Sequence, residues 1–142
     1  MESESSSVVL AIDPGSDKCG VAVVARSGAV LSRAIVPTSN LTETVRRLIT
    51  EFLPIHIVCG KGTGSKPILR ELEAASLQAP LSSVDESYTS EAARARFVAE
   101  NPPKGLERLL PRSLRTPSVP YDDYVAVILA ERYWRDVAAA DR

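Results

Sequence analysis

Five acidic residues stand at the boundaries of strongly apolar segments, where regular structure is expected to begin or end. They are Asp13, Asp85, Glu86, Asp122 and Asp123. Carboxylates that converge in a partly buried site repel one another, and a divalent cation bound through oxygen ligands is the usual resolution. Mg²⁺ or Mn²⁺ held in this way activates water and assists an in-line displacement at phosphorus. Taken singly, each acid also suits a simpler role as a turn residue or a helix cap.

The spacing of apolar residues predicts the elements that must position these acids. Strands are predicted at 8–12, 20–25, 29–36, 55–59 and 81–84. Helices are predicted at 41–52, 67–77 and 91–100, and a last helix begins at Asp122. Short turns join the first three strands, which predicts an antiparallel meander. Asn40 and Glu43 have the spacing of a capping box, Pro54 ends the first helix, and Pro67 suits the first turn of the second.

Parallel pairing would bring the acids to one edge of the sheet. If the strands at 8–12 and 55–59 pair in parallel, as a strand–helix–strand connection allows, their carboxyl ends lie side by side. The strand at 81–84 would end at the same edge, just before Asp85. The last helix would bring Asp122 there as well. The order of elements therefore predicts a cluster of carboxylates at one edge.

Three motifs, in the same order along the chain, resemble those of the YqgF/RuvX family. The segment DPGSDKCGVAV at 13–23 resembles the opening motif DxGxxxxGxA, and DESYTSEA at 85–92 resembles the second motif, DERxTTxxA. DDYVAVIL at 122–129 resembles the last motif, an Asp that precedes an Ala-rich helix. The resemblance covers about residues 8–135. The opening and the segments PPKG and RLLPRSLR look most like a divergent branch described as Holliday-junction resolvase-like.

The resemblance implies an α/β protein with an RNase H-like fold: a mixed five-stranded sheet, strands one to three antiparallel, flanked by helices. It also implies a metal-dependent nuclease in which Asp13, Glu86 and Asp122 are catalytic and bind Mg²⁺ or Mn²⁺. Asp123 is the rival of Asp122, because the register is open by one residue, and Asp85 is a further candidate. The implied partners are nucleic acids, either RNA or branched or single-stranded DNA. A homodimer is compatible with junction cleavage.

Two departures from the family pattern concern the substrate. Ser87 stands where the family usually has Arg, which removes an expected phosphate contact. The loop from Gly60 to Lys66 lacks the usual GLP-type sequence, although Lys61 and Lys66 are available to contact phosphates. Substrate preference is therefore the part of the resemblance that needs its own test.

Basic residues concentrate in one part of the chain although the formal net charge is −1. Residues 87–120 contain six basic and three acidic residues, a net charge of +3, which leaves −4 for the rest. The candidates for nucleic-acid binding are Lys18, Lys61, Lys66, Arg94, Lys104, Arg108, Arg112 and Arg115. Lys and Arg neutralise phosphates without reading sequence, and the alternative is a solvated face. Aromatic residues make up only 5%, which argues against an extended stacking platform.

The composition sets the remaining bounds. With 142 residues we expect a disordered polar tail at 1–7 and a single nuclease domain at 8–142, with a Pro-rich basic loop at about 102–120. Cys19 and Cys59 have no metal-site spacing, and the lone His56 suits a strand position. Neither a membrane span nor a signal peptide is predicted, so we expect a cytoplasmic protein without membrane contact.

Two other classes of protein share parts of this pattern. A catalytically inactive RNase H-like protein would keep the fold and bind nucleic acid without cutting it. Actin-like or sugar-kinase-like ATPases share the DxG opening, but they need two such lobes and this length supplies one. The presence of all three acidic motifs favours the nuclease.

Overall fold

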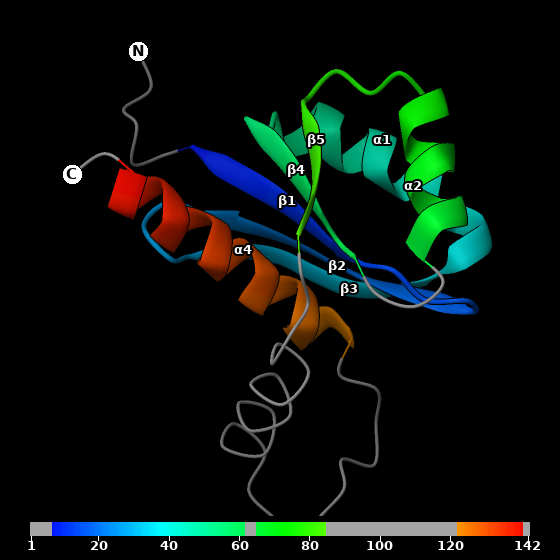
Figure 1. Ribbon diagram of the computed structural model, residues 1–142, viewed down its shortest axis with the longest axis horizontal. Coiled ribbons are helices and arrows are strands. Elements are labelled where there is room, and N and C mark those ends of the chain that lie inside the picture. The colour runs from blue at the N-terminus through cyan, green and yellow to red at the C-terminus, as the bar shows by residue number, and fades with distance from the viewer. Residues whose placement is uncertain (1–6, 62–64, 85–121, 141–142) are drawn as a thin grey trace, which may run out of the picture.

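A mixed five-stranded sheet with the strand order β3-β2-β1-β4-β5 forms the centre of the molecule, and helices cover both faces (Figure 1). The computed structural model describes residues 7–61, 65–84 and 122–140. The strands are β1 (Val8–Asp13), β2 (Lys18–Ala25), β3 (Val30–Pro37), β4 (His56–Gly60) and β5 (Leu81–Val84). The helices are α1 (Leu41–Phe52), α2 (Ser65–Ala74) and α4 (Asp122–Ala140), with a 3₁₀ turn at Thr38–Asn40. The α/β class and the flanked mixed sheet predicted from the sequence are confirmed.

The pairing of the strands confirms both predicted arrangements. β1 pairs with β2 and β2 with β3 in antiparallel fashion, which is the meander. β1 pairs with β4 and β4 with β5 in parallel, so these three strands end at the same edge of the sheet. Asp13 is the last residue of β1 and therefore lies at that edge.

Alternate residues of the central strands pack on opposite faces, as the period of two requires. Leu10 and Ile12 belong to the core that α1 and α2 cover. Val9 and Ala11 belong to the core under α4. Asp13 continues the second set, so its Cβ is on the face that α4 covers. Figure 1 shows α4 on one side of the sheet and the other two helices on the opposite side.

Helix α4 lies close to the sheet because its contact stripe contains small residues. Ala126 and Ala130, one turn apart, are fully buried against Ala11 and Ala22 of the sheet. The stripe ends with Trp134, whose Nε1 donates a hydrogen bond to the carbonyl oxygen of Val24 at 3.0 Å. The apolar residues of the last helix are thus spaced so that they face β1 and β2.

Several boundaries differ from the predicted ones. The side chain of Asn40 makes no capping hydrogen bond, so the predicted capping box is wrong; a 3₁₀ turn leads into α1 instead. Leu53, in the left-handed conformation, closes α1 with a hydrogen bond from its N–H to the carbonyl of Ile49, just before Pro54. Helix α2 begins two residues before Pro67 and ends at Ala74 rather than at 77, because Ala75 and Ser76 form a tight turn.

At the start of the described chain, Ser7 is hydrogen-bonded to the residue that follows β2. Its carbonyl accepts a hydrogen bond from the N–H of Arg26 at 2.9 Å, which extends the β1–β2 pairing by one step. The predicted helix at 91–100 and the predicted loop at 102–120 lie outside the described residues. Among the helices that the structure does describe, none is both long and apolar enough to cross a membrane.

Candidate active site at the carboxyl edge of the sheet

Asp13 has no side chain beside it from either neighbouring strand. On β2 its partner is Gly20. On β4 the register that pairs Ile12 with Cys59 places Gly60 next to Asp13. Cross-strand neighbours on one face normally bring their Cβ atoms within about 5 Å of each other. The half-buried Asp13 carboxylate is therefore flanked by two positions that contribute only backbone.

The other parallel strand ends in the same row. Gly60 pairs with Val84, the last residue of β5, and the N–H of Lys61 donates to the Val84 carbonyl at 2.7 Å. The chain thus leaves β5 at the edge where Asp13 lies. The predicted acids Asp85 and Glu86 come next and lie outside the described residues.

The turn that follows Asp13 is held by the end of β3. The hydroxyl of Thr38 donates to the carbonyl of Gly15 at 2.8 Å, and its N–H donates to the carbonyl of Asp17 at 2.9 Å. A Cβ on Gly15 would collide with the carbonyl oxygen of Lys18, so the turn requires glycine there. Sequence reasoning missed Thr38, because nothing in the local pattern links it to a turn more than twenty residues earlier.

Helix α4 begins close to this edge. Asp122 is its first residue, one turn before the buried Ala126. The next residue, Asp123, forms an ion pair with Arg33 of β3. Arg33 pairs with Ala22 of β2, which pairs with Ala11 of β1, so these three residues form one row across the sheet. That row is two residues before Asp13 on the same face. The structure therefore places the start of α4 over the carboxyl half of β1.

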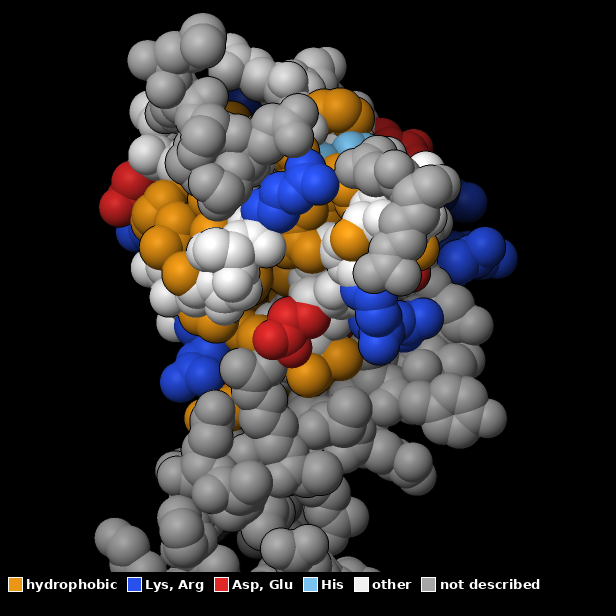
Figure 2. All heavy atoms as spheres, turned by 90° about the vertical axis from the view of Figure 1, so that its left-hand side faces the viewer, with side chains coloured by type: hydrophobic (Ala, Val, Ile, Leu, Met, Phe, Trp, Pro, Cys, Tyr) orange, Lys and Arg blue, Asp and Glu red, His pale blue; other side chains and the backbone are white. Residues whose placement is uncertain are grey.

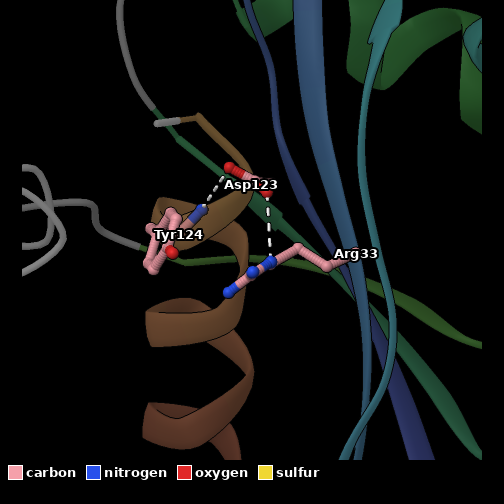
Figure 3. Close-up of polar contacts among 3 residues, drawn as sticks. All are labelled: Arg33, Asp123 and Tyr124. Carbon is pink, nitrogen blue, oxygen red and sulfur yellow. Dashed lines mark hydrogen bonds and ion pairs between the residues drawn. The ribbon is translucent and has the colours of Figure 1, made fainter. Parts of the chain in front are cut away.

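Arg33 connects the first turn of α4 to the edge strand β3 (Figure 3). Its Nε lies 3.2 Å from Oδ2 of Asp123, and its guanidinium lies 4.3 Å from the ring centre of Tyr124. The other carboxylate oxygen, Oδ1, accepts a hydrogen bond from the N–H of Tyr124 at 3.1 Å. Both Asp123 oxygens thus have partners within the chain. Sequence reasoning missed Arg33, which has no signal of its own in an alternating strand.

The chemistry of Asp13 suits a hard divalent cation, since a carboxylate oxygen is the ligand that Mg²⁺ and Mn²⁺ prefer. Among the residues that the structure describes, no three His, Cys, Asp or Glu side chains converge in a metal-binding group. Glu86 and the side chain of Asp122 are outside that set. Of the three predicted ligands, the described residues therefore include the side chain of Asp13, with glycines at the adjacent positions of β2 and β4.

The three described lysines among the candidates for nucleic-acid binding are exposed at or near this edge. Lys18 begins β2, Lys61 follows β4, and Lys66 is the second residue of α2. The five other candidates lie outside the described residues: Arg94, Lys104, Arg108, Arg112 and Arg115. Positive charge thus lies at or near the edge where Asp13 lies.

The opposite end of the α4 face has a different construction. His56 stacks on Tyr133, with 5.2 Å between ring centres and 19° between planes, and its Nε2 is hydrogen-bonded to the hydroxyl of Ser82. Burial lowers the pKa of His56 and raises the pKa of Tyr133, which Arg26 partly offsets. His56 is a strand residue, as predicted. Its neighbours are aromatic and hydroxyl groups rather than carboxylates.

Figure 2 shows the end of the molecule that carries the amino end of β1 and the carboxyl end of α4. Hydrophobic side chains lie there in several groups between separate Lys, Arg, Asp and Glu side chains. The exposed large hydrophobic residues of the described chain occur in the segments that begin β3 and precede β4: Val30, Leu31, Leu53 and Ile55. Among the described residues, basic and acidic side chains both appear at this end.

The arrangement of strands and helices is similar to that of solved Holliday junction resolvases. T. thermophilus RuvC in complex with a Holliday junction substrate aligns with 92% of this chain and 96% of that chain, at a TM-score of 0.58 and 17% identity. The yeast mitochondrial Holliday junction resolvase Ydc2 aligns with 92% of this chain and 78% of its own, at 0.53 and 12% identity. The chain therefore has the RNase H-like fold of these proteins.

Sequence comparison does not assign the chain to a family. No family model matches the chain, and no curated protein matches it either. The RNase H-like fold is thus established by structure, and the narrower YqgF/RuvX resemblance stays a prediction.

Proposed function

We propose that this protein is a divalent-metal-dependent nuclease that hydrolyses phosphodiester bonds in nucleic acid, of the YqgF/RuvX type. The observation that carries the proposal is the place of Asp13. It ends the central strand of an RNase H-like sheet, on the face under α4, between Gly20 and Gly60. This carboxylate lies between two glycine positions at the edge where three parallel strands end, and we take the place beside it as the one that a cation and a phosphate would occupy.

Asp13, Glu86 and Asp122 would hold Mg²⁺ or Mn²⁺. A cation bound there would lower the pKa of a water and offset the charge that develops on the phosphate oxygens. The ion pair of Asp123 with Arg33 supports Asp122 over Asp123 as the third ligand, because the Asp123 oxygens already have partners. Thr38 would keep the Asp13 turn in place by its two hydrogen bonds.

The exposed lysines would position the nucleic acid backbone. Lys18 and Lys61 are exposed at the same edge as Asp13, and we expect them to contact a phosphodiester strand that reaches it. Their contacts would be to phosphates, which sets register without selecting sequence. The basic segment 87–120 would extend this contact along the strand.

Among the predicted substrates, a four-way DNA junction is the first to test, since a protein of similar fold was solved bound to one. Paired cuts in a junction need two active sites, hence a dimer. A monomer would favour RNA or single-stranded DNA. Sedimentation of the purified protein separates these two expectations before any substrate is added.

The decisive experiment is a cleavage panel. The protein is incubated with a four-way DNA junction, single-stranded DNA or structured RNA, with Mg²⁺ or Mn²⁺, beside an Asp13→Asn variant. We expect metal-dependent cleavage of at least one substrate and a loss of about 10³-fold or more in the variant, as when a group that stabilises transition-state charge is removed. Absence of cleavage from all substrates, or full activity in Asp13→Asn, would overturn the proposal. Metal-independent binding without cleavage would identify the inactive nucleic-acid-binding alternative.

A further inference from the structure

We infer that Arg33 is a positioning residue: by holding Asp123 and Tyr124 it fixes the first turn of α4 and hence the place of Asp122 in the metal site. This inference rests on the proposed function, since it concerns how that site is assembled. Arg33 comes from the edge strand β3 and is not itself an expected metal ligand (Figure 3).

A helix begins with backbone N–H groups that lack intrahelical partners, and its first turn frays unless something holds it. In α4 the two residues after Asp122 are both held by one guanidinium. Arg33 pairs with the Asp123 carboxylate at 3.2 Å and lies on the Tyr124 ring at 4.3 Å. Since adjacent Cα atoms are 3.8 Å apart, fixing these two residues leaves Asp122 little freedom.

The exposure of the three residues falls from Arg33 at the rim to Tyr124 in the core. Tyr124 is buried, and the side chain of Asp123 is 16% exposed. The Arg33 side chain is 37% exposed, so the guanidinium reaches from the rim of the sheet over the buried pair. A planar guanidinium can make an ion pair and stack on a ring at the same time, which an ammonium cannot do equally well.

Charge alone and positioning predict opposite changes in metal affinity when Arg33 is removed, so the direction of the change tests the inference. Arg33 is a cation near a site expected to bind cations. Removing it would strengthen metal binding if charge were the only effect. Removing it weakens metal binding if its role is to place Asp122. Loss of a residue that orients a metal ligand typically costs 10–100-fold in metal affinity.

The experiment measures Mn²⁺ affinity by electron paramagnetic resonance, without any nucleic acid. The variants are Arg33→Ala, Arg33→Lys, Asp123→Ala and the double Arg33→Ala/Asp123→Ala. Arg47→Ala, an exposed arginine on α1 at the opposite face, is the matched control, and circular dichroism reports folding. We expect Arg33→Ala to weaken Mn²⁺ binding about tenfold, Arg33→Lys to weaken it less, and Arg47→Ala to leave it unchanged.

The double variant shows whether Arg33 acts through Asp123. If the two residues form one anchor, the double variant binds Mn²⁺ about as weakly as either single variant. Unchanged or tighter binding in a folded Arg33→Ala protein overturns the inference, and so does a double variant in which the two losses add.

Asp13→Asn separates this inference from the proposed function. If Asp13→Asn loses Mn²⁺ binding while Arg33→Ala matches the unaltered protein, only the positioning role is wrong. If Asp13→Asn binds Mn²⁺ as the unaltered protein does, or if neither binds, the metal site is wrong and the positioning role is wrong with it.

Discussion

The two ends of the sheet face under α4 are built from opposite kinds of residue. At the carboxyl edge Asp13 has Gly20 and Gly60 beside it. At the opposite end, where β1 and β4 begin (the amino end of the face), Trp134 packs with the central strands and Tyr133 packs with His56. Large aromatic side chains thus hold the helix where β1 and β4 begin, whereas glycines flank Asp13 where these strands end. Under the proposed function, stability and chemistry are separated along one helix of 19 residues.

The attachments of α4 differ in strength as well. Trp134 is 8% exposed and its indole N–H reaches a buried backbone carbonyl. The Arg33–Asp123 pair is partly exposed, and such pairs contribute between zero and about 1 kcal/mol. We therefore expect the amino-end packing to dominate the free energy of unfolding and the carboxyl edge to dominate activity. Three substitutions test this division, in order of decreasing effect.

The largest expected effect is on stability, from Trp134→Ala. Removing a buried Trp costs about 3–5 kcal/mol, and the Val24 carbonyl would also lose its partner. Urea denaturation should show that loss, while the folded fraction keeps its nuclease activity and metal affinity.

The neighbouring exposed Arg135→Ala serves as the control on the same helix and should change the free energy of unfolding by less than about 0.5 kcal/mol. A folded Trp134→Ala protein with lost metal affinity would show that the two ends of the face are coupled, contrary to the division.

Gly20→Ala tests the other end. The added Cβ would lie beside Asp13, in the space proposed for the cation and the phosphate. A displacement of about 1 Å in a reacting group can cost roughly 10²-fold in rate, so we expect a loss of that order. The measurement is single-turnover cleavage of whichever substrate the panel identifies.

Ala22→Val is the matched substitution, two residues along the same strand and on the same face. Ala22 is fully buried under α4, so the larger side chain should cost about 1–3 kcal/mol of stability through overpacking. Its activity at low temperature should persist. If Gly20→Ala cuts normally, the space beside Asp13 is not used as we propose.

Much of this arrangement could be predicted from the sequence, because its signals are local. The apolar runs at 8–12 and 81–84 and the strand–helix order gave the sheet and its parallel pairs, and with them the edge where Asp13 lies. Element ends were less predictable. Asn40 has the residue type and spacing of a helix cap. The chain nevertheless enters α1 through a 3₁₀ turn, and the Asn40 side chain makes no capping hydrogen bond.

The supporting contacts could not be predicted, because each joins residues far apart in the chain. Arg33 meets Asp123 only because β3 is the edge strand next to β2 and α4 crosses both. Thr38 holds the Asp13 turn only because β3 ends beside it. A local sequence pattern can nominate candidates such as Asp13, but it contains no signal for the distant residues that contact them.

The smallest expected effect is a pH dependence at the amino end. His56 is the one histidine in the chain, and burial lowers its pKa from the ordinary value of 6.5. The folded state therefore disfavours the protonated ring, while the unfolded state takes up the proton near pH 6.5. Between these two pKa values the unfolded state binds more protons, so stability falls as the pH falls through this window. Above about pH 6.5 the ring is neutral in both states, and this loss of stability is absent.

The measurement is the urea midpoint at pH 7.5 and pH 5.5, for the unaltered protein and for His56→Gln. Glutamine can still bond to the Ser82 hydroxyl but does not titrate, so its midpoint should fall less between the two pH values. Carboxylates are common to both proteins and cancel in the comparison. Equal decreases would mean that His56 protonates as readily in the fold as outside it. The packing of His56 on Tyr133 would then not bury the ring enough to affect its protonation.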